Sequence, residues 1–334
     1  MSSSAPHLSV AASPGTLSAE QLLAIHDTML KARVLEERLI TMYKQGEGYF
    51  WIGGPGEEAF NVPLGMLVDK GQGVDHDFLH LHYRSSGTLL AMGADPVDSI
   101  RQMKNVATDP YSKGRNFAGH FSVKKWNVVP VSSPIEVQFS IAIGTARAQR
   151  AAKGITIVQG GDAGTAEGDF ATALVWSSRK GAELPLLMIV TNNRFGISTP
   201  FAGQHGYEQI AERGKAFGMP TAVVDGNDPE ASWAALQKAL HYVRTEKKPY
   251  LLEAMVSRLR GHSSASGANL AKDEVDCLER FEKTLEERKL ITRPQIDALR
   301  EKYLLQLGEA AQRVRGEPAP SADSIHDFTF AEHA

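Results

Sequence analysis

The sequence has few of the features that mark secreted, membrane-spanning or disulfide-stabilised proteins. Its 334 residues include one cysteine, Cys277, which excludes an internal disulfide framework and a cysteine-rich zinc site and suits a reducing compartment. No run approaches the ~20 continuous apolar residues that a membrane span needs. Residues 1–16 contain no arginine or lysine, which argues against a signal or transit peptide. We therefore expect a cytoplasmic protein without a membrane partner.

The sequence also lacks a clear excess of positive or of negative charge. The chain has 36 Lys and Arg against 39 Asp and Glu, a formal net charge of −3, and it contains no basic block that would suit a nucleic-acid backbone. We therefore do not expect nucleic acid as a partner. Hydrophobic residues make up 42% and charged residues 22%, which is typical of a chain that folds around a core. The length fits two domains or one α/β domain with added helices.

Helix signals indicate a folded body between two tails. Ser18 and Gln21 have the spacing of a capping box, and apolar residues at helical spacing predict a first helix as far as about Tyr43. Thr292, which precedes Arg-Pro, predicts the start of the last long helix. We predict a tail over residues 1–17, a single α/β domain with helical extensions over residues 18–315 and a C-terminal tail over residues 316–334.

Two segments inside this body lack a regular period. Residues 46–56 are rich in glycine and aromatic residues, and residues 108–131 form an irregular stretch of a length that is usually functional or disordered. Directly after the second segment, Ser133 is followed by Pro134 and Glu136. This pattern predicts a helix with Ser133 as its N-cap and Pro134 as its first residue.

The second half of the chain alternates between segments with the pattern of strands and segments with the pattern of helices. Short apolar runs predict strands over residues 155–159, 186–191, 221–224 and 250–256, and helical segments are predicted at residues 167–180 and 229–243. Strands separated by helices of this length form βαβ units. The predicted fold is therefore α/β, a parallel sheet with helices on both faces.

Polar residues follow the first two of these predicted strands. Asp162 comes after the first strand within Gly-Gly-Asp-Ala-Gly, and Asn193 comes after the second. Right-handed crossovers bring both strand ends to one edge of the sheet, where ligands bind. A carboxylate and an amide oxygen are ligands that suit magnesium, and the flanking glycines allow backbone N–H groups to approach phosphate. The pattern predicts a magnesium and phosphate site.

This pattern is not one of the commoner phosphate motifs. It has neither the Gly-Lys-Ser/Thr of a P-loop nor the Gly-x-Gly-x-x-Gly of a dinucleotide fold. A flavodoxin-like or nucleotide-binding protein would also place glycines and an acid at this edge. His76, His80 and His82 lie close together, but they lack the other ligands of a zinc site.

The pairing of Gly-Asp-x-Gly with Asn-Asn about thirty residues later resembles the thiamine-diphosphate motif of thiamine-dependent enzymes. Residues 161–169, Gly-Asp-Ala-Gly-Thr-Ala-Glu-Gly-Asp, and residues 192–199, Asn-Asn-Arg-Phe-Gly-Ile-Ser-Thr, are similar to the α subunit of heterotetrameric 2-oxo acid dehydrogenases, their decarboxylating first component. Ser-Ser-Pro at residues 132–134, Gln138 and Asp-Cys-Leu-Glu-Arg-Phe at residues 276–281 favour the branched-chain type. The resemblance covers residues 20–310.

The resemblance implies a set of site residues. Asp162, Asn193 and the carbonyl of Phe195 match the magnesium ligands. His262 matches an active-site histidine that transfers a proton during acyl transfer, which a near-neutral pKa would suit. The residues implied to contact thiamine diphosphate are Tyr83, Arg84, Ser133, Ile135, Asp162, Ala163, Gly164, Asn193, Arg258 and His262. Val137 stands where branched-chain relatives have a threonine that helps to hold potassium, so a potassium ion is a weaker expectation.

The resemblance also implies a reaction and an assembly. The expected reaction is the oxidative decarboxylation of a 2-oxo acid, with transfer of the acyl group to a lipoyl group on an acyltransferase core. The expected partner is a β subunit in an α2β2 heterotetramer. The residues leave 3-methyl-2-oxobutanoate, pyruvate and acetoin open as substrates. A catalytically silent scaffolding subunit also stays open, because Thr191 replaces an arginine of the family and Gly267 lies in a loop that usually carries an aspartate.

Overall fold

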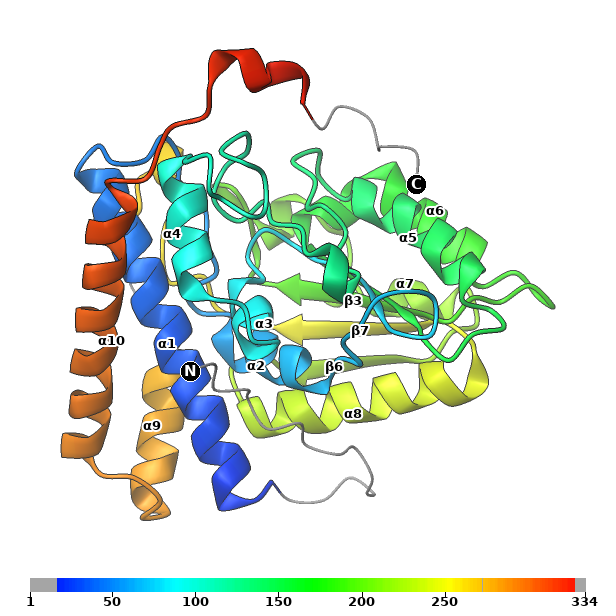
Figure 1. The fold of residues 1–334 in the computed structure, drawn as a ribbon. Coiled ribbons are helices and arrows are strands. Elements are labelled where there is room, and N and C mark those ends of the chain that lie inside the picture. The colour runs from blue at the N-terminus through cyan, green and yellow to red at the C-terminus, as the bar shows by residue number, and fades with distance from the viewer. Residues whose placement is uncertain (1–16, 272, 328–334) are drawn as a thin grey trace.

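A five-stranded parallel β-sheet forms the centre of the molecule (Figure 1). The structure is a computed structural model, and it describes residues 17–271 and 273–327. In spatial order the strands are β1 (Phe78–His80), β2 (Thr156–Gly161), β3 (Leu186–Asn192), β7 (Tyr250–Met255) and β6 (Thr221–Asp225). Every neighbouring pair is parallel, so the carboxyl ends of the strands lie at one edge. The predicted fold class is confirmed.

Helices lie on both faces of the sheet and beside it. The described α-helices are α1 (Ala19–Lys44), α2 (Glu58–Leu67), α3 (Ser86–Ala91), α4 (Pro96–Lys104), α5 (Val137–Ala148), α6 (Gly168–Ser177), α7 (Glu212–Lys215), α8 (Pro229–Glu246), α9 (Cys277–Glu287) and α10 (Arg293–Val314). A small hairpin of β4 (Phe195–Gly196) and β5 (Thr199–Pro200) follows β3. None of the helices in the described ranges is both long and apolar enough to cross a membrane.

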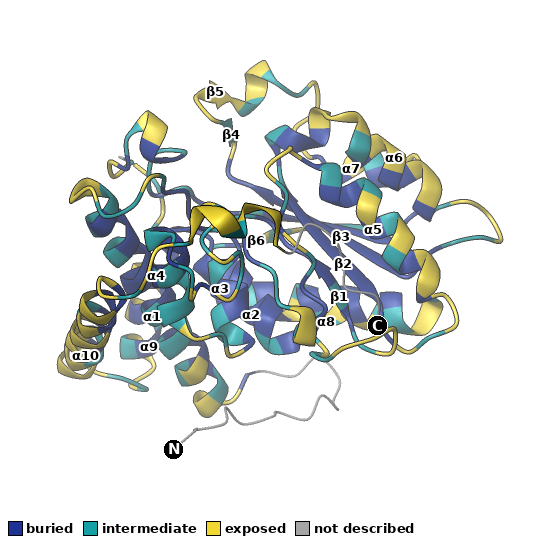
Figure 2. Ribbon diagram, turned by 45° about the horizontal axis from the view of Figure 1, so that its top comes forward, coloured by how far each residue is buried: buried dark blue, intermediate teal, exposed yellow. Residues whose placement is uncertain are grey.

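The two faces of the sheet pack against different helices because strand side chains alternate between the faces. Along β3, Leu186, Met188 and Val190 belong to the core shared with α5 and α6. Leu187 and Ile189 belong to the larger core shared with α8 and α1. Figure 2 shows the central strands β2, β3 and β7 buried, with exposed residues on the outer faces of the helices and in the loops. The edge strand β6 is partly exposed. The sheet is therefore a rigid support for the loops at its carboxyl edge.

The helices α1, α9 and α10 form a layer beside the sheet (Figure 1). Ser18 and Gln21 make the predicted capping box at the start of α1. Arg33 of α1 lies 2.6 Å from the carboxylates of both Glu58 in α2 and Asp276 before α9. Since Arg33 is buried, this double ion pair fixes the helical layer to the rest of the domain.

Most of the predicted elements are confirmed, with ends that differ by up to a few residues. The four predicted strands correspond to β2, β3, β6 and β7, and the predicted helices between them correspond to α6 and α8. The strand β1 has three residues and was not predicted, because so short a run carries little periodicity. Within residues 108–131 the described regular structure is a 3-10 turn at Lys124–Trp126 and isolated bridges, as expected of an irregular stretch.

The predicted start of the helix after that stretch is wrong. The helix α5 begins at Val137, and its N-cap is Glu136 rather than Ser133. Glu136 has a φ of 62°, in the left-handed region, and it is 1% exposed. Burial of Glu136 against the loop that follows β2 therefore overrides the local capping pattern of Ser133 and Pro134.

Candidate cofactor site

The loops that follow four of the strands bring five predicted residues to one edge of the sheet. Tyr83 and Arg84 follow β1, Asp162 follows β2, Asn193 follows β3 and Arg258 follows β7. The continuous register of these strands sets the loops side by side. In an open parallel sheet this is the edge at which ligands bind.

Asp162 is an incompletely satisfied buried acid. It is 1% exposed, and its Oδ2 has no hydrogen-bond partner among the described residues. Burial raises the pKa of Asp162 to about 6, while backbone N–H groups, including that of Asn193, and the charge of Arg258 oppose this rise. A buried carboxylate oxygen without a partner is costly. A bound cation at Oδ2 would remove that cost.

Asn193 lies in the turn that follows β3. Its Oδ1 accepts a hydrogen bond from the N–H of Phe195 over 3.1 Å, and the intervening Arg194 has a left-handed φ of 64°. The guanidinium of Arg258 lies 5.1 Å from the centroid of the Phe195 ring. Nη1 of Arg258 is buried without a hydrogen-bond partner in the described part of the chain. Arg258 therefore offers a cationic donor that an anionic ligand can satisfy.

Gly160 and Gly164 leave room for a carboxyl group that the sequence analysis did not assign to the site. A Cβ at either glycine would overlap the carboxylate of Glu136. Neither oxygen of Glu136 has a hydrogen-bond partner within the described residues. Burial raises the pKa of Glu136 well above its ordinary value, and the charge of Asp162 acts in the same direction. The loop after β2 therefore carries one buried acid, Asp162, and packs against a second, Glu136.

Arg84 connects the Tyr83–Arg84 pair to His262. Its guanidinium donates to the backbone oxygen of His262 over 3.0 Å and to Nδ1 over 3.1 Å. The ring of Tyr83 meets the ring of His262 edge-on, with centroids 6.3 Å apart. Burial lowers the pKa of His262 to about 4, and the charges of Arg84 and Arg258 act in the same direction. In the cofactor-free chain His262 is therefore neutral at neutral pH, and its pKa is not near-neutral as the sequence analysis expected.

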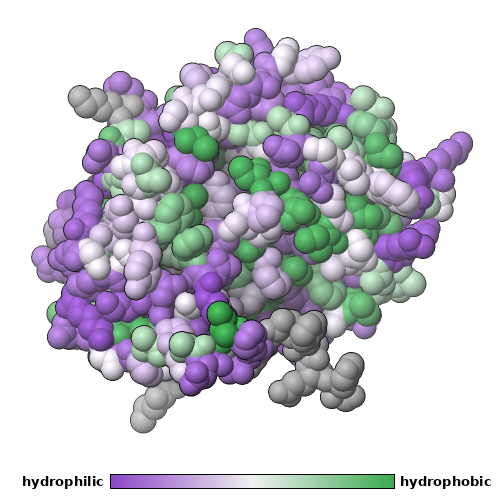
Figure 3. Space-filling view, turned by 90° about the horizontal axis from the view of Figure 1, so that it is seen from above, coloured by the Kyte–Doolittle hydropathy of each residue, from purple (hydrophilic) through white to green (hydrophobic). Residues whose placement is uncertain are grey.

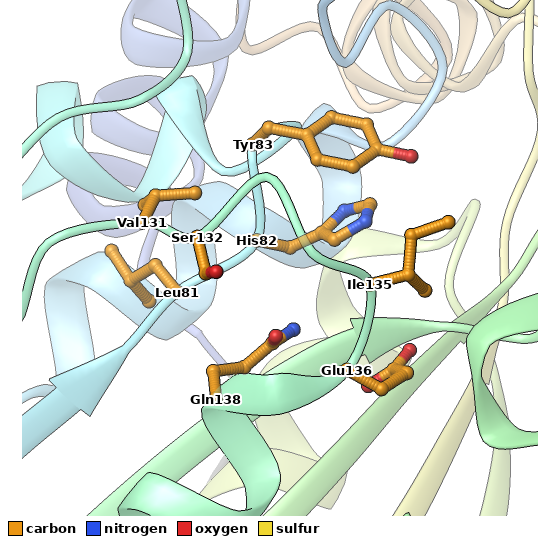
Figure 4. Close-up of a pocket in the computed structure, with 8 residues that line it drawn as sticks. All are labelled: Leu81, His82, Tyr83, Val131, Ser132, Ile135, Glu136 and Gln138. Atoms are coloured by element: carbon orange, nitrogen blue, oxygen red, sulfur yellow. The ribbon is translucent and has the colours of Figure 1, made fainter. Parts of the chain in front are cut away.

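The other predicted contacts surround these residues. Ala163 and Gly164 form a 3-10 turn (Ala163–Ala166) directly after Asp162. The hydroxyl of Ser133 lies 2.8 Å from Nε2 of His120, and Ile135 is 55% exposed. Figure 4 shows Ile135 and Glu136 lining a small pocket together with His82 and Tyr83, whose ring centroids lie 3.8 Å apart and whose planes are tilted by 38°. The fold therefore gathers the residues that the resemblance implied, although α5 starts later than predicted.

Two neighbours of the site, His120 and Glu136, were not assigned to it from the sequence. The position of His120 within the irregular stretch of residues 108–131 was a signal for it, whereas Glu136 looked like a helix-capping residue. A place for His82 in the pocket lining could be inferred from the sequence, because it adjoins the Tyr-Arg pair. His76 and His80 have other partners, Asp69 and Thr145, so the three nearby histidines do not converge.

Comparisons with known proteins show the family to which this chain belongs. The family model described as "Dehydrogenase E1 component" matches residues 26–323. This match covers most of the chain, and the chain belongs to that family. The predicted resemblance to the first component of 2-oxo acid dehydrogenases is confirmed.

The relatives carry a more particular name. The "2-oxoisovalerate dehydrogenase subunit alpha" of Bacillus subtilis is 29% identical over 326 residues, which are 95% of this chain and 97% of that protein. The mitochondrial subunit of the same name from Caenorhabditis elegans is 32% identical over 80% of this chain and 62% of its own length. The human mitochondrial subunit is 28% identical over 78% and 58%. The chain thus spans nearly all of the bacterial relative and about three fifths of these two mitochondrial ones.

Proposed function

We propose that this chain is the α subunit of a 2-oxo acid dehydrogenase that acts on 3-methyl-2-oxobutanoate and related branched-chain 2-oxo acids. The observation that carries the proposal is the unsatisfied Oδ2 of Asp162 beside Asn193 at the carboxyl edge of the sheet, with the unsatisfied Nη1 of Arg258 in the same site. A divalent cation and a diphosphate supply the missing partners. The shared name of the bacterial and mitochondrial relatives supports the substrate class.

The donor set fits thiamine diphosphate with magnesium. Asp162, Asn193 and the carbonyl of Phe195 would hold the cation with oxygen ligands, which magnesium prefers. The arginines Arg84 and Arg258 would offset the charge of the diphosphate. Bound thiamine diphosphate would supply the electron sink for loss of carbon dioxide from the 2-oxo acid.

The chain's own residues would bind the cofactor, orient it and shield it from water. Ala163 and Gly164 would bring backbone N–H groups toward the diphosphate, because Gly164 has no side chain to obstruct the approach. Ser133, Ile135 and Tyr83 would line the rest of the cofactor pocket. His262 would be the catalytic residue that holds or moves a proton during transfer of the acyl group to a lipoyl group.

A potassium ion finds less support than magnesium. Val137 contributes no side-chain oxygen, whereas Oε1 of Gln138 and both oxygens of Glu136 are buried without hydrogen-bond partners among the residues described. These acceptors would suit a cation or a water molecule beside the Ser132–Pro134 turn. Flame photometry of the purified protein, with a Gln138→Leu variant for comparison, tests for the ion.

The outer surface supports a protein partner. Ile141 on α5 and Val175 and Trp176 on α6 are 48%, 47% and 43% exposed. Figure 3 shows apolar side chains toward the side of the molecule on which α5 and α6 lie, while the side of α1 and α10 is largely hydrophilic. Exposed apolar surface of this kind marks an interface. We propose that a β subunit covers it in an α2β2 heterotetramer, which delivers acyl groups to a lipoylated acyltransferase core.

We also place the complex in the cytoplasm, on the ground that Cys277 is a buried free thiol. The eukaryotic relatives are named as mitochondrial, so a fluorescent fusion expressed in the source cell is the direct test.

The first experiment is a calorimetric titration of thiamine diphosphate, with and without magnesium, into the chain co-purified with its partner. Asp162→Asn is expected to abolish magnesium-dependent binding because it removes the ligand charge. Asp225→Asn is the matched control, since Asp225 ends β6 at the same sheet edge and pairs with Arg280. Equal binding by wild type and Asp162→Asn would contradict the proposed site.

A second experiment compares turnover of the candidate substrates to identify the preferred one. Reduction of an artificial acceptor with 3-methyl-2-oxobutanoate, pyruvate and acetoin is measured with both chains present. Preference for the branched acid is expected. Preference for pyruvate or acetoin would replace the substrate but keep the cofactor, whereas cofactor binding without any turnover would indicate a silent subunit.

A further inference from the structure

Arg84 is bound by the protein itself on several sides. It is 3% exposed, and its guanidinium donates to the backbone oxygens of Gly53 and His262 and to Nδ1 of His262. Gly54 permits this burial, because a Cβ there would overlap the backbone oxygen of Arg84. The residue is therefore clamped between the segment before α2 and the loop after β7.

The contact with Arg84 determines which ring nitrogen of His262 carries the proton. A guanidinium can donate hydrogen bonds but cannot accept them. Nδ1 of His262, 3.1 Å from Nη2 of Arg84, must therefore be the acceptor. The proton of the neutral ring then lies on Nε2, and Nδ1 is not available as a base while Arg84 stays in place.

A buried guanidinium needs a nearby counter-charge, and Glu57 supplies it above neutral pH. Burial raises the pKa of Glu57 to about 7, and the charge of Arg84 opposes this rise. Oε1 of Glu57 lies 3.9 Å from Nε of Arg84, and Glu57 is 1% exposed. Oε1 has no hydrogen-bond partner among the residues in the described ranges, so charge rather than a hydrogen bond ties it to Arg84.

Asn61 completes the connection. Its Nδ2 donates to the backbone oxygen of Arg84 over 3.2 Å, and Oε2 of Glu57 lies 3.5 Å away. Its Oδ1 accepts from Gln159 of β2 over 2.9 Å, and Gln159 in turn accepts from Ser85 over 2.9 Å. All these side chains are buried. The start of α2 is therefore linked to the backbone oxygen of Arg84 and, through Gln159 of β2, to the neighbouring Ser85.

We propose that Glu57 is a positioning residue of this site: its carboxylate holds the guanidinium of Arg84 against His262, and Arg84 keeps His262 as the tautomer with its proton on Nε2. The inference rests on the proposed function, because that function assigns proton transfer to His262. It gives Glu57, which directly follows the glycine-rich residues 46–56 and is the N-cap residue of α2, a role that neither its sequence pattern nor the family name states.

The experiment records the ¹⁵N chemical shifts of the two ring nitrogens of His262 by NMR at about pH 8.5, where the Glu57 carboxylate is charged, in the cofactor-free full chain with any partner chain that co-purifies. The charged groups that face His262 are Arg84 after β1 and Arg258 after β7, and the neutral rings of Tyr83 and His82 lie beside them. The two shifts report which ring nitrogen carries the proton. Because no cofactor is present, the result does not depend on whether the proposed function is correct.

Glu57→Gln keeps the shape of the side chain and removes its charge. With its counter-charge lost, Arg84 is expected to leave Nδ1. The ¹⁵N shifts of Nδ1 and Nε2 are then expected to move toward each other, because both tautomers of the ring become populated. Glu57→Asp, which keeps the carboxylate, is expected to stay closer to wild type. Arg84→Met serves as the reference for complete loss of the contact.

Asp77→Asn is the matched control. Asp77 is buried and pairs with Arg244 over 2.7 Å, but it precedes β1 and so lies at the opposite edge of the sheet. This variant loses a buried acid–arginine pair and is expected to lower the melting temperature while leaving the ring-nitrogen shifts of His262 unchanged. Unchanged shifts in Glu57→Gln would overturn the proposal. An equal change of the shifts in Glu57→Asp and Glu57→Gln would overturn it as well, because packing rather than charge would then be responsible.

Discussion

Gly164 lies directly against the carboxylate of Glu136, so that any Cβ at position 164 would overlap its Oε1. Glu136 comes from the start of α5, whereas Gly164 belongs to the turn after Asp162. The start of α5 and the turn after Asp162 therefore pack directly against each other in the candidate cofactor site, because Gly164 has no side chain.

Gly164→Ala is expected to lower the free energy of unfolding by about 1–3 kcal/mol and to weaken thiamine diphosphate binding, because the added methyl group overpacks this contact. Urea denaturation and calorimetric titration measure the two effects. Adding Glu136→Ala should recover much of the loss. In Gly168→Ala, where a Cβ would meet open space, stability should change by about 0.5 kcal/mol or less. An equal loss in both glycine variants would contradict the expected overlap.

His80 should make the fold sensitive to mild acid. Burial lowers the pKa of His80 to about 4, whereas an unfolded histidine titrates near 6.5. The unfolded chain therefore binds the extra proton first, so stability is complete above about pH 6.5 and falls as the pH drops toward 4. The loss attributable to His80 is about 3 kcal/mol at most.

His80→Asn should flatten this slope in denaturation curves recorded between pH 7 and pH 4. His241→Asn is the control, because His241 lies on the exposed side of α8. If the slope is the same in His80→Asn and in wild type, the acid sensitivity belongs to other groups.

Arg33 should be far more important for stability than a surface arginine. It bridges the buried Glu58 and the partly buried Asp276, so Arg33→Met leaves both carboxylates without this counter-charge. We expect the free energy of unfolding to fall by about 3–5 kcal/mol. Arg280→Met breaks a pair in which both side chains are 47% exposed and should cost about 1 kcal/mol or less. Thermal melts of both variants check the difference, and similar costs would show that the buried bridge adds nothing.

Trp176→Glu tests the proposed interface on α5 and α6. A charge in the middle of an apolar contact should prevent assembly with the β chain while leaving the unfolding of the isolated chain within about 0.5 kcal/mol of wild type. Light scattering after size-exclusion chromatography reports the mass of the complex. Leu305→Glu is the control, since Leu305 is 64% exposed on α10 at the hydrophilic side of the molecule. Normal assembly of Trp176→Glu would place the β chain elsewhere.

The local sequence pattern was sufficient to predict those elements whose formation depends on neighbouring residues. The apolar runs that became β2, β3, β6 and β7, and the capping box at Ser18, follow from side-chain burial and backbone hydrogen bonding within a few residues. The pairing of Asp162 with Asn193 could also be predicted, because parallel strands joined by right-handed crossovers end at one edge. The predicted domain limits at residues 17 and 315 stay predictions.

Only the tertiary structure decided the start of α5 and the chemistry of His262. The pattern at Ser133 satisfied every local rule for a cap, yet α5 begins at Val137 because Glu136 is buried against glycines that lie more than twenty residues further along the chain. Likewise, the pKa of His262 depends on burial and on Arg84, which is 178 residues away in the sequence. Desolvation and long-range charge act through space, and a sequence pattern records neighbours along the chain but not the distances that folding creates.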